Sequence, residues 1–427
     1  MSEVRRIVPC GPVRGTFRVP GSKSLTNRAL VCAALARGTS VLLNASDSQD
    51  SALMANGLNQ LGILVRRDGS RWEVGGKGGA LYAPRFPIPV GNAGTTLRFF
   101  LALSGLAEGR VVLEGSPRMR ERPNEELIDV LRSGGIAVQQ DPELSRYEVT
   151  GGIFRGGEVS IRQDRSSQFL SALLLIAPHA AAPVEVLVEG PRISEPYVRM
   201  TLEVMRAFGA VVVDHAAGVS FGIQAPQRYR AREYAIEPDA SGASYGLGAA
   251  AITGGEVLVE GMRLASSQGD ASFPQILAQM GCVVEETGQG VRLTGTRALT
   301  GIDVEMNAMP DAVPTLAALA LFASTPTRIR NVAHLRFKES DRIGSLATEV
   351  RKLGGSIVIY EDGLEIKPAP LHGGTVATYD DHRMAMAAAL IGLRVPGVEV
   401  ENPACVQKSF PRFWEELDRL CATRVSA

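Results

Sequence analysis

The sequence predicts an α/β fold of a particular kind: a two-domain inside-out α/β barrel, with helices at the centre and sheets outside. Two patterns, a glycine-marked junction and a polar helix start, recur along the chain with one period of about 72 residues. In addition, several helical segments are apolar on nearly all sides, which places them in the interior. Six βαβαββ repeats, three per domain, account for the chain.

The first pattern is an amphipathic helix, then a glycine, then a β-branched strand. It occurs as LNQLGILV, LRSGGIAV, MRAFGAVVV, LAQMGCVVE and VRKLGGSIV, whose repeat glycines are residues 62, 135, 209, 281 and 354. Successive glycines are 72 to 74 residues apart. The regular spacing predicts equivalent helix-to-strand junctions in successive repeats.

The second pattern is a polar helix start, a small-residue apolar helix, a turn marked by Gly or Pro, and a strand. Its copies begin at Ser22, Asn92, Ser166, Asp239, Asp311 and Asp381. Ser, Asn and Asp cap helices well, so capping is the simplest interpretation of each start. If three such helices pack in parallel in each domain, their N-termini converge and form an anion-binding field of backbone N–H groups.

Composition sets limits on function. With 427 residues, equal numbers of acidic and basic residues and a pI of about 7, the chain suits two domains and lacks the basic excess of nucleic-acid or membrane-surface binders. The five cysteines are scattered without a CxxC motif, which predicts a reduced, cytoplasmic protein with thiols as small core residues. No metal motif, signal peptide or transmembrane run is present in the sequence.

Some residues at the helix starts are not explained by capping. Lys23, Arg28 and Arg383 bring cations to helix starts, where the dipole disfavours them by roughly 0.3–1 kcal/mol. Gly94 stands in a first turn, where glycine costs ~1 kcal/mol relative to alanine. Solvated side chains would explain the cations alone, whereas a bound anion explains both the cations and the close backbone approach at Gly94.

Cations recur at one further position of the repeat. SPRMRERPNEEL, RFKESDRIGSL and QKSFPRFWEEL each precede the repeat's second helix, in units two, five and six. Charge runs are commonly solvated faces. Because these three segments occupy equivalent places in the repeat, a cleft lined by their cations is a stronger interpretation than a solvated face.

PGSKSLTNRAL, GNAGTTLRF, RMRERP, SSQFLSALL, DASGASY, MPDA, FKESDR, DHRMAM and QKSFPRF together resemble the 5-enolpyruvylshikimate-3-phosphate synthase family, in order from residue 20 to 413. The resemblance implies transfer of the enolpyruvyl group of phosphoenolpyruvate to shikimate 3-phosphate by addition–elimination, with release of phosphate. It implies no metal or organic cofactor, and small-molecule substrates as the partners of a monomer. It also implies domains at 1–20 with 238–427 and at 21–237, and an active site in the cleft between them. The two chain crossings near residues 20 and 238 predict hinge closure, with Pro20–Gly21 and Glu237–Pro238 as the candidate hinges.

The resemblance assigns site residues one by one. Contacts to shikimate 3-phosphate are implied for Lys23, Ser24, Arg28, Ser166, Ser167, Gln168, Ser194, Asp311 and Lys338. Contacts to phosphoenolpyruvate are implied for Lys23, Gly94, Arg122, Gln168, Arg342, Arg383 and Lys408. Asp311 is the candidate base for the substrate hydroxyl, and Lys23 and Glu339 are candidates for protonating the enol carbon and assisting phosphate release.

Two positions depart from the family pattern. Phe99 stands where many members have proline, and His334 where some have asparagine. Gly94 implies sensitivity to glyphosate, and Phe99 leaves its extent open.

Two alternative functions fit these motifs less well. A UDP-N-acetylglucosamine enolpyruvyl transferase typically has a cysteine in the loop that here reads GSPRMRERP, and an Asn where this chain has Ser24. A non-catalytic anion-binding repeat protein would have no use for Asp311 and Glu339 among cations, because acids weaken anion binding.

Overall fold

The computed structural model describes residues 3–215 and 217–422. The chain divides into two compact units. Unit 1 contains the residues up to Pro20 and from Glu237 onward, and unit 2 contains Gly21–Ile236. Each has its own hydrophobic core, with no core residue shared between the two. Residues 1, 2 and 423–427 of the expected domain bounds lie outside the described residues.

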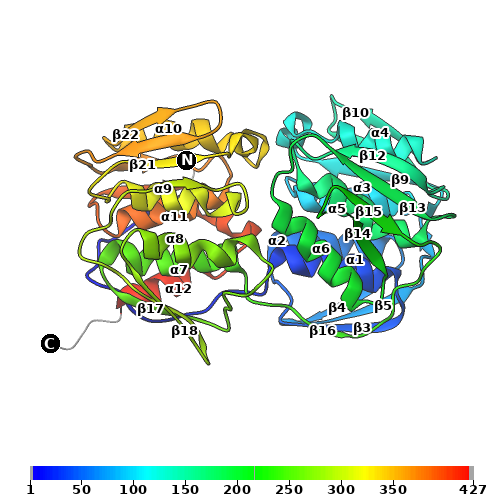
Figure 1. The fold of residues 1–427 in the computed structure, drawn as a ribbon, viewed down its shortest axis with the longest axis horizontal. Helices are drawn as coiled ribbons and strands as arrows, with labels where there is room; N and C mark the ends of the chain where they lie inside the picture. The colour runs from blue at the N-terminus through cyan, green and yellow to red at the C-terminus, as the bar shows by residue number, and fades with distance from the viewer. Residues whose placement is uncertain (1–2, 216, 423–427) are drawn as a thin grey trace. The chain divides into compact units, whose positions relative to one another are not determined.

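Unit 2 is an α/β assembly of three four-stranded sheets and six α-helices in its described residues (Figure 1). Its helices are α1 (Lys23–Leu35), α2 (Gln49–Gln60), α3 (Gly94–Ser104), α4 (Glu125–Ser133), α5 (Ser167–Ile176) and α6 (Glu195–Ala207). The strands of its first sheet are, in order, β16 (Glu233–Ala235), β3 (Arg37–Leu43), β5 (Arg71–Lys77) and β4 (Leu64–Asp68). Those of the second are β7 (Ile88–Gly91), β9 (Arg110–Gly115), β11 (Arg146–Thr150) and β10 (Ala137–Asp141). Those of the third are β12 (Gly157–Arg162), β13 (Val184–Glu189), β15 (Ser220–Ile223) and β14 (Val212–His215). A short ladder of β6 (Leu81–Tyr82) and β8 (Ala107–Glu108) is added.

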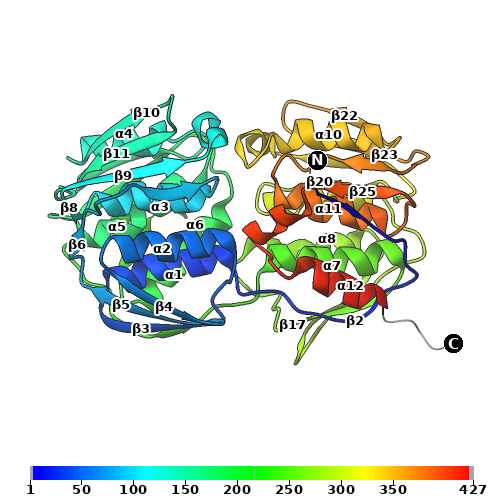
Figure 2. The same ribbon diagram turned by 180° about the vertical axis from the view of Figure 1, so that it is seen from behind.

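Unit 1 is built in the same way, with the chain's N-terminal segment supplying two strands (Figure 2). Its helices are α7 (Ala240–Thr253), α8 (Phe273–Gln279), α9 (Val313–Ala320), α10 (Arg342–Lys352), α11 (His382–Gly392) and α12 (Phe413–Ala422). Its sheets are β2 (Arg14–Phe17), β17 (Glu256–Glu260), β19 (Gly290–Thr294), β18 (Val283–Thr287); β20 (Asp303–Glu305), β21 (Thr327–Arg330), β23 (Leu364–Lys367), β22 (Ser356–Ile359); and β24 (Gly374–Val376), β25 (Val398–Glu401), β1 (Val4–Arg6).

All six larger sheets share one pairing scheme. The first strand runs parallel to the second, and the remaining neighbours are antiparallel. In two sheets the first strand comes from a distant part of the sequence: β16 pairs with β3, and β2 pairs with β17. The predicted mixed α/β fold is confirmed.

Three helices in each unit are almost completely buried and pack on one another. These are α1, α3 and α5 in unit 2, and α7, α9 and α11 in unit 1. Small residues permit close approach in α7, where the ring of Phe17 lies against Gly246. By contrast α4, α6, α10 and α12 are amphipathic, with one apolar buried side, although Arg342 and Glu349 of α10 and Glu416 of α12 are also buried.

Four of the six predicted helix starts are N-caps, namely Ser22, Ser166, Asp239 and Asp381. At the other two predicted starts, Asn92 and Asp311, the helix begins two residues further along the chain. α3 begins at Gly94 without a side-chain cap, because its N-cap residue is Ala93; the side chain of Asn92, one residue earlier, accepts a bond from Arg122. Asp311 lies in a 3₁₀ turn (Pro310–Ala312), and α9 begins two residues later with a proline in its first turn.

The prediction that all five cysteines are small core residues was wrong for two of them. Cys32, Cys282 and Cys405 are buried, as expected. Cys10 and Cys421 are only partly buried, because they lie on the N-terminal segment and on the last helix, at the edge of unit 1.

Candidate active site

Lys23 is the first residue of the buried helix α1. Its Nζ lies 3.0 Å from Oδ2 of Asp50 on α2, and both side chains are largely buried. Ser22 caps the helix by accepting a bond from the N–H of Leu25. The carboxylate of Asp50 therefore offsets the dipole penalty at Lys23 while holding its ammonium group in place. Asp50 was not among the residues expected from the sequence.

Arg28, the other cation of α1, is 1% exposed and is bonded to protein groups. Its guanidinium donates to the hydroxyls of Thr201 and Ser171 and to the carbonyls of Ser24 and Tyr197, at 2.7 to 3.3 Å. Burial lowers the pKa of Arg28 to about 10, so the group stays charged at neutral pH. These bonds explain the tolerated cation without a ligand. The ring of Phe99 lies 5.5 Å from its guanidinium carbon.

Gly94 and the guanidinium of Arg122 lie close together at the start of α3. Arg122 donates to the carbonyl and side-chain oxygens of Asn92 at 2.9 and 3.2 Å, and its guanidinium lies over Gly94. A Cβ added at Gly94 would be 2.5 Å from Nη2 of Arg122. Glycine is needed here because the arginine occupies the space above the helix start.

The start of α5 carries Ser166, Ser167 and Gln168. Ser166 accepts a bond from the N–H of Gln168 at 3.2 Å, and Gln168 accepts one from Arg98 at 2.7 Å. Arg98, which the sequence did not single out, also donates to Asn124 and to the carbonyl of Pro123. The amide of Gln168 is thus held by a buried arginine from α3.

Ser194 lies just before α6 in an uncommon backbone conformation. Its φ is +52°, in the left-handed region, and the residue is 2% exposed. In a residue other than glycine this conformation is strained, and the surrounding structure must hold it in place. Strained residues of this kind are common at binding sites.

A charge network in unit 1 joins Asp311, Arg342, Arg383 and two further carboxylates. Asp311 receives one bond from Arg342 at 2.8 Å and one from Arg383 at 2.7 Å, each on a different oxygen. Arg342 also binds Glu339 at 2.8 Å and Asp381 at 2.8 and 3.3 Å. Its guanidinium is therefore surrounded by acids on three sides, with 1% of the side chain exposed.

The network fixes the protonation states of its members. Burial by itself would raise the pKa of Asp311, but the charges of Arg383, Arg342 and Lys338 outweigh it and hold that pKa well below its usual range. Burial likewise opposes the charge of Arg342, and the three carboxylates keep it protonated by raising its pKa. Asp311 is therefore a firmly ionised carboxylate in this state.

His334, Lys338 and Lys408 complete the expected set in unit 1. His334 is 3% exposed, and burial together with the charge of Lys338 lowers its pKa to about 3, so its imidazole is neutral. Lys338 follows the 3₁₀ turn Ala333–Phe337, and Lys408 ends the turn Pro403–Lys408 with 7% of the residue exposed.

Asp270 is a second carboxylate that the sequence did not reveal. It lies in the 3₁₀ turn Gly269–Ser272, which packs on the turn of Asp311, and it accepts a hydrogen bond from Ser241 at the start of α7. Burial and the nearby charge of Asp311 raise the pKa of Asp270 to about 7. No local motif marks it, because its environment arises from contacts between distant segments.

The expected site residues are divided between the two units. Unit 2 holds Lys23, Ser24, Arg28, Gly94, Arg122, Ser166, Ser167, Gln168 and Ser194, and unit 1 holds Asp311, Lys338, Glu339, Arg342, Arg383 and Lys408. Within residues 3–215 and 217–422, no group of three His, Cys, Asp or Glu side chains is placed to hold a metal ion. Over the same residues, every helix is too short or too polar to cross a bilayer.

Comparison with known proteins gives one consistent result. The family model described as EPSP synthase (3-phosphoshikimate 1-carboxyvinyltransferase) matches residues 7–417. A 3-phosphoshikimate 1-carboxyvinyltransferase from Nostoc sp. strain PCC 7120 is 45% identical, over 95% of this chain and 97% of its own. The solved EPSP synthase of Acinetobacter baumannii has a TM-score of 0.81 at 26% identity, covering 98% of both chains. The enolpyruvyl transferase NikO of Streptomyces tendae, at 19% identity and a TM-score of 0.77, shares the fold.

Proposed function

The chain belongs to the EPSP synthase family, and from this premise we propose how its residues carry out the family's reaction. It is an enzyme that transfers the enolpyruvyl group of phosphoenolpyruvate to shikimate 3-phosphate and releases phosphate, in aromatic amino-acid biosynthesis. The proposal concerns the 5-hydroxyl as acceptor, the residues that bind each substrate and the groups that move protons.

We propose that each unit is an inside-out barrel of three βαβαββ repeats. The support is the common pairing scheme of the six larger sheets and the three buried helices of each unit. In this arrangement the starts of the buried helices carry the substrate-binding residues, so that backbone N–H groups and cations act on the same anions.

Shikimate 3-phosphate is proposed to bind mainly to unit 2. Ser166, Ser167 and Ser194 supply hydroxyls for its phosphate, with Lys23 as the cation. Gln168 is held by Arg98 and is therefore ready to bond a ring hydroxyl. Ser24 and Arg28 complete that side, although the hydrogen bonds of Arg28 to Thr201, Ser171 and Tyr197 favour a role in holding α1, α5 and α6 together.

Phosphoenolpyruvate is proposed to bind to residues from both units, most of them cations. Lys23, Gly94, Arg122 and Gln168 come from unit 2, and Arg342, Arg383 and Lys408 from unit 1. We propose that the two sets act on one pair of substrates, with hinges at Pro20–Gly21 and Glu237–Pro238. The two chain crossings are joined by a bond from the N–H of Asp239 to the carbonyl of Pro20, at 2.9 Å, which supports a hinge at this place.

The position of Asp311 between two arginines is the observation that carries the mechanism. Arg342 and Arg383 are the cations proposed to bind phosphoenolpyruvate, and both now stabilise the ionised form of Asp311. An arriving anion competes for these guanidinium groups and weakens their hold on the carboxylate. The pKa of Asp311 then rises toward the range in which a carboxylate can take a proton from the acceptor hydroxyl. Lys338 is a further cation near Asp311.

Protonation of the enol carbon is proposed to involve Glu339 or Lys23. Glu339 is 9% exposed and is bonded to Arg342, so substrate binding to that arginine would also raise the proton affinity of Glu339. Lys23 carries a proton already and is oriented by Asp50. A cytoplasmic location and a monomeric state stay predictions from the sequence.

A substrate comparison tests the proposed function. Purified protein is given phosphoenolpyruvate with either shikimate 3-phosphate or UDP-N-acetylglucosamine, and released phosphate is measured. We expect release with shikimate 3-phosphate alone. Release with the UDP-sugar alone would assign the sister reaction, and binding of both anions without release would assign a non-catalytic binding protein.

A further inference from the structure

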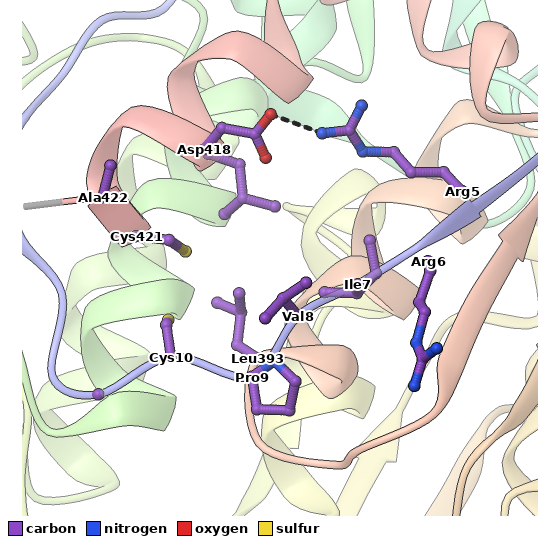
Figure 3. Close-up of a pocket in the computed structure, with 12 residues that line it drawn as sticks. Arg5, Arg6, Ile7, Val8, Pro9, Cys10, Leu393, Asp418, Cys421 and Ala422 are labelled. Carbon is purple, nitrogen blue, oxygen red and sulfur yellow. Dashed lines mark hydrogen bonds and ion pairs between the residues drawn. The ribbon is translucent and has the colours of Figure 1, made fainter.

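The N-terminal segment of unit 1 runs along helix α12, and the two line an open cavity of about 460 Å³ together with Leu393 (Figure 3). The segment is fixed on both sides of Cys10. On one side Arg5 binds Asp418 at 2.6 Å and stacks on Trp414. On the other, Arg419 donates to the carbonyl of Thr16. Cys10 itself is anchored by a bond from its N–H to the carbonyl of Leu393, at 3.1 Å.

Between these anchors, the thiol of Cys10 faces the thiol of Cys421 on α12. Both residues line the cavity, and Figure 3 shows their side chains directed toward each other. Both residues are partly exposed. The remaining cysteines, Cys32, Cys282 and Cys405, are buried and lie in other parts of the fold.

The pair has the unequal reactivity that thiol exchange requires. The hydrogen bond from Cys421 lowers the pKa of Cys10, against a smaller opposing effect of burial. The same bond, followed by burial, raises the pKa of Cys421. Cys10 is thus the attacking thiolate, and Cys421 the resolving thiol beside it. Burial raises the pKa of Cys405 to about 12, and it raises those of Cys32 and Cys282 as well, which leaves these three unreactive.

We propose that Cys10 and Cys421 are a modification site that forms a reversible disulfide with a small-molecule disulfide, such as oxidised glutathione, as oxidant. The cavity has the volume of a small-molecule pocket and gives the oxidant access to Cys10. The bond fastens the N-terminal segment to the last helix of unit 1.

The chemistry proceeds in two exchanges. The thiolate of Cys10 attacks one sulfur of the small disulfide, breaks its S–S bond and releases one thiolate, which takes up a proton. The thiol of Cys421 then loses its proton to water and attacks the sulfur of Cys10 in the mixed disulfide, expelling the second thiolate. Two protein thiols are oxidised to one disulfide, and one small disulfide is reduced to two thiols.

The cross-link encloses almost the whole chain and therefore restricts the unfolded state strongly. In the folded state both residues line the same cavity with their side chains directed toward each other, so the bond forms between groups that are already neighbours. We expect the oxidised protein to unfold at a higher temperature than the reduced protein.

The test uses the full chain equilibrated in buffers of increasing oxidised-to-reduced glutathione ratio. Remaining thiols are alkylated, and the digested protein is mapped by mass spectrometry. We expect a peptide pair joined through Cys10 and Cys421, with Cys32, Cys282 and Cys405 alkylated only after denaturation. The melting temperature should rise as this pair accumulates, and dithiothreitol should reverse the change.

Matched variants complete the experiment. Cys10→Ser and Cys421→Ser should each abolish the bridged peptide and the rise in melting temperature, whereas Cys282→Ala should keep both. The wild-type map alone suffices if a variant folds poorly. Absence of the bridge at every ratio, or a bridge that involves another cysteine or a second chain, would overturn the proposal.

Discussion

At the scale of single residues, the chemistry depends on how charges are paired. Asp311 is held ionised by Arg342 and Arg383, whereas Asp270, on the adjoining turn, is pushed toward its neutral form. The two aspartates thus differ in proton affinity because Asp311 is bonded to guanidinium groups, whereas Asp270 is buried beside another carboxylate.

Replacing Asp311 by asparagine removes the proposed base and keeps the shape of the side chain. We expect Asp311→Asn to fold with a melting temperature near that of the wild type, because Arg342 keeps its bonds to Glu339 and Asp381. Turnover should fall on the order of 10²- to 10⁴-fold. Phosphate release under saturating substrates measures the effect.

Asp303→Asn is the matched control, since Asp303 forms an exposed ion pair with Arg330 on the surface of the same unit. It should leave turnover unchanged. Wild-type phosphate release by Asp311→Asn would exclude Asp311 from the proton transfer.

Replacing Gly94 by alanine tests the close approach of Arg122. The new Cβ would lie 2.5 Å from Nη2 of the arginine, so the guanidinium has to move away from its present place. We expect KM for phosphoenolpyruvate to rise on the order of 10- to 100-fold, with a smaller change in KM for shikimate 3-phosphate.

Gly152→Ala serves as the comparison, because nothing lies within 4 Å of a Cβ at that position of the same unit. Its steady-state kinetics should match the wild type. Equal KM values for Gly94→Ala and wild type would show that Arg122 does not hold phosphoenolpyruvate.

At the scale of elements, the sequence was most informative where a local rule decides the structure. Ser22, Ser166, Asp239 and Asp381 cap buried helices as predicted, because capping depends on residues two or three positions apart. Asn92 and Asp311 do not cap the buried helices that were predicted to begin at them. Their side chains make long-range bonds instead, Asn92 with Arg122, and Asp311 with Arg342 and Arg383. Asp50, Arg98 and Asp270 could not be predicted, since their partners come from other segments.

The packing of α7 on β2 gives a prediction for an element. Alanine has a higher helix propensity than glycine by ~1 kcal/mol. At Gly246, however, a Cβ would lie 2.4 Å from Cδ1 of Phe17, and overpacking of this kind costs about 1–3 kcal/mol. We expect Gly246→Ala to lower the free energy of unfolding, as measured by denaturant titration.

The same substitution at Gly242, in the first turn of α7, provides the contrast. There the nearest atom to a new Cβ is Oδ1 of Asp239 at 3.4 Å, an ordinary contact. Gly242→Ala should therefore be neutral or slightly stabilising. A stabilised Gly246→Ala protein would mean that Phe17 can move aside at little cost.

At the scale of the whole molecule, the 72-residue period predicted a repeated βαβαββ unit, and the six larger sheets share one pairing scheme. What the period could not give is the source of each first strand. Residues 233–235 complete the sheet of β3, and residues 14–17 complete that of β17, over separations of about 190 and 240 residues. Such pairings are set by how the ends of each unit meet, which no local pattern encodes.

This topology predicts different behaviour for two fragments. Residues 21–236 contain every strand of their own sheets and a complete core, so we expect the isolated fragment to fold and melt cooperatively. Residues 237–427 lack β1, β2 and Phe17, and we expect them to stay largely unfolded. Near-ultraviolet circular dichroism with thermal melting distinguishes the two. Equal behaviour of the fragments would contradict the division.

The pairing of β2 with β17 also has a consequence for biosynthesis. The ribosome makes residues 14–17 first, but their partners appear only after some 240 further residues have been translated. By then residues 21–236 have emerged whole and are able to fold, as domains commonly do during translation. The strand at residues 14–17 must therefore stay unpaired until residues 256–259 have left the exit tunnel.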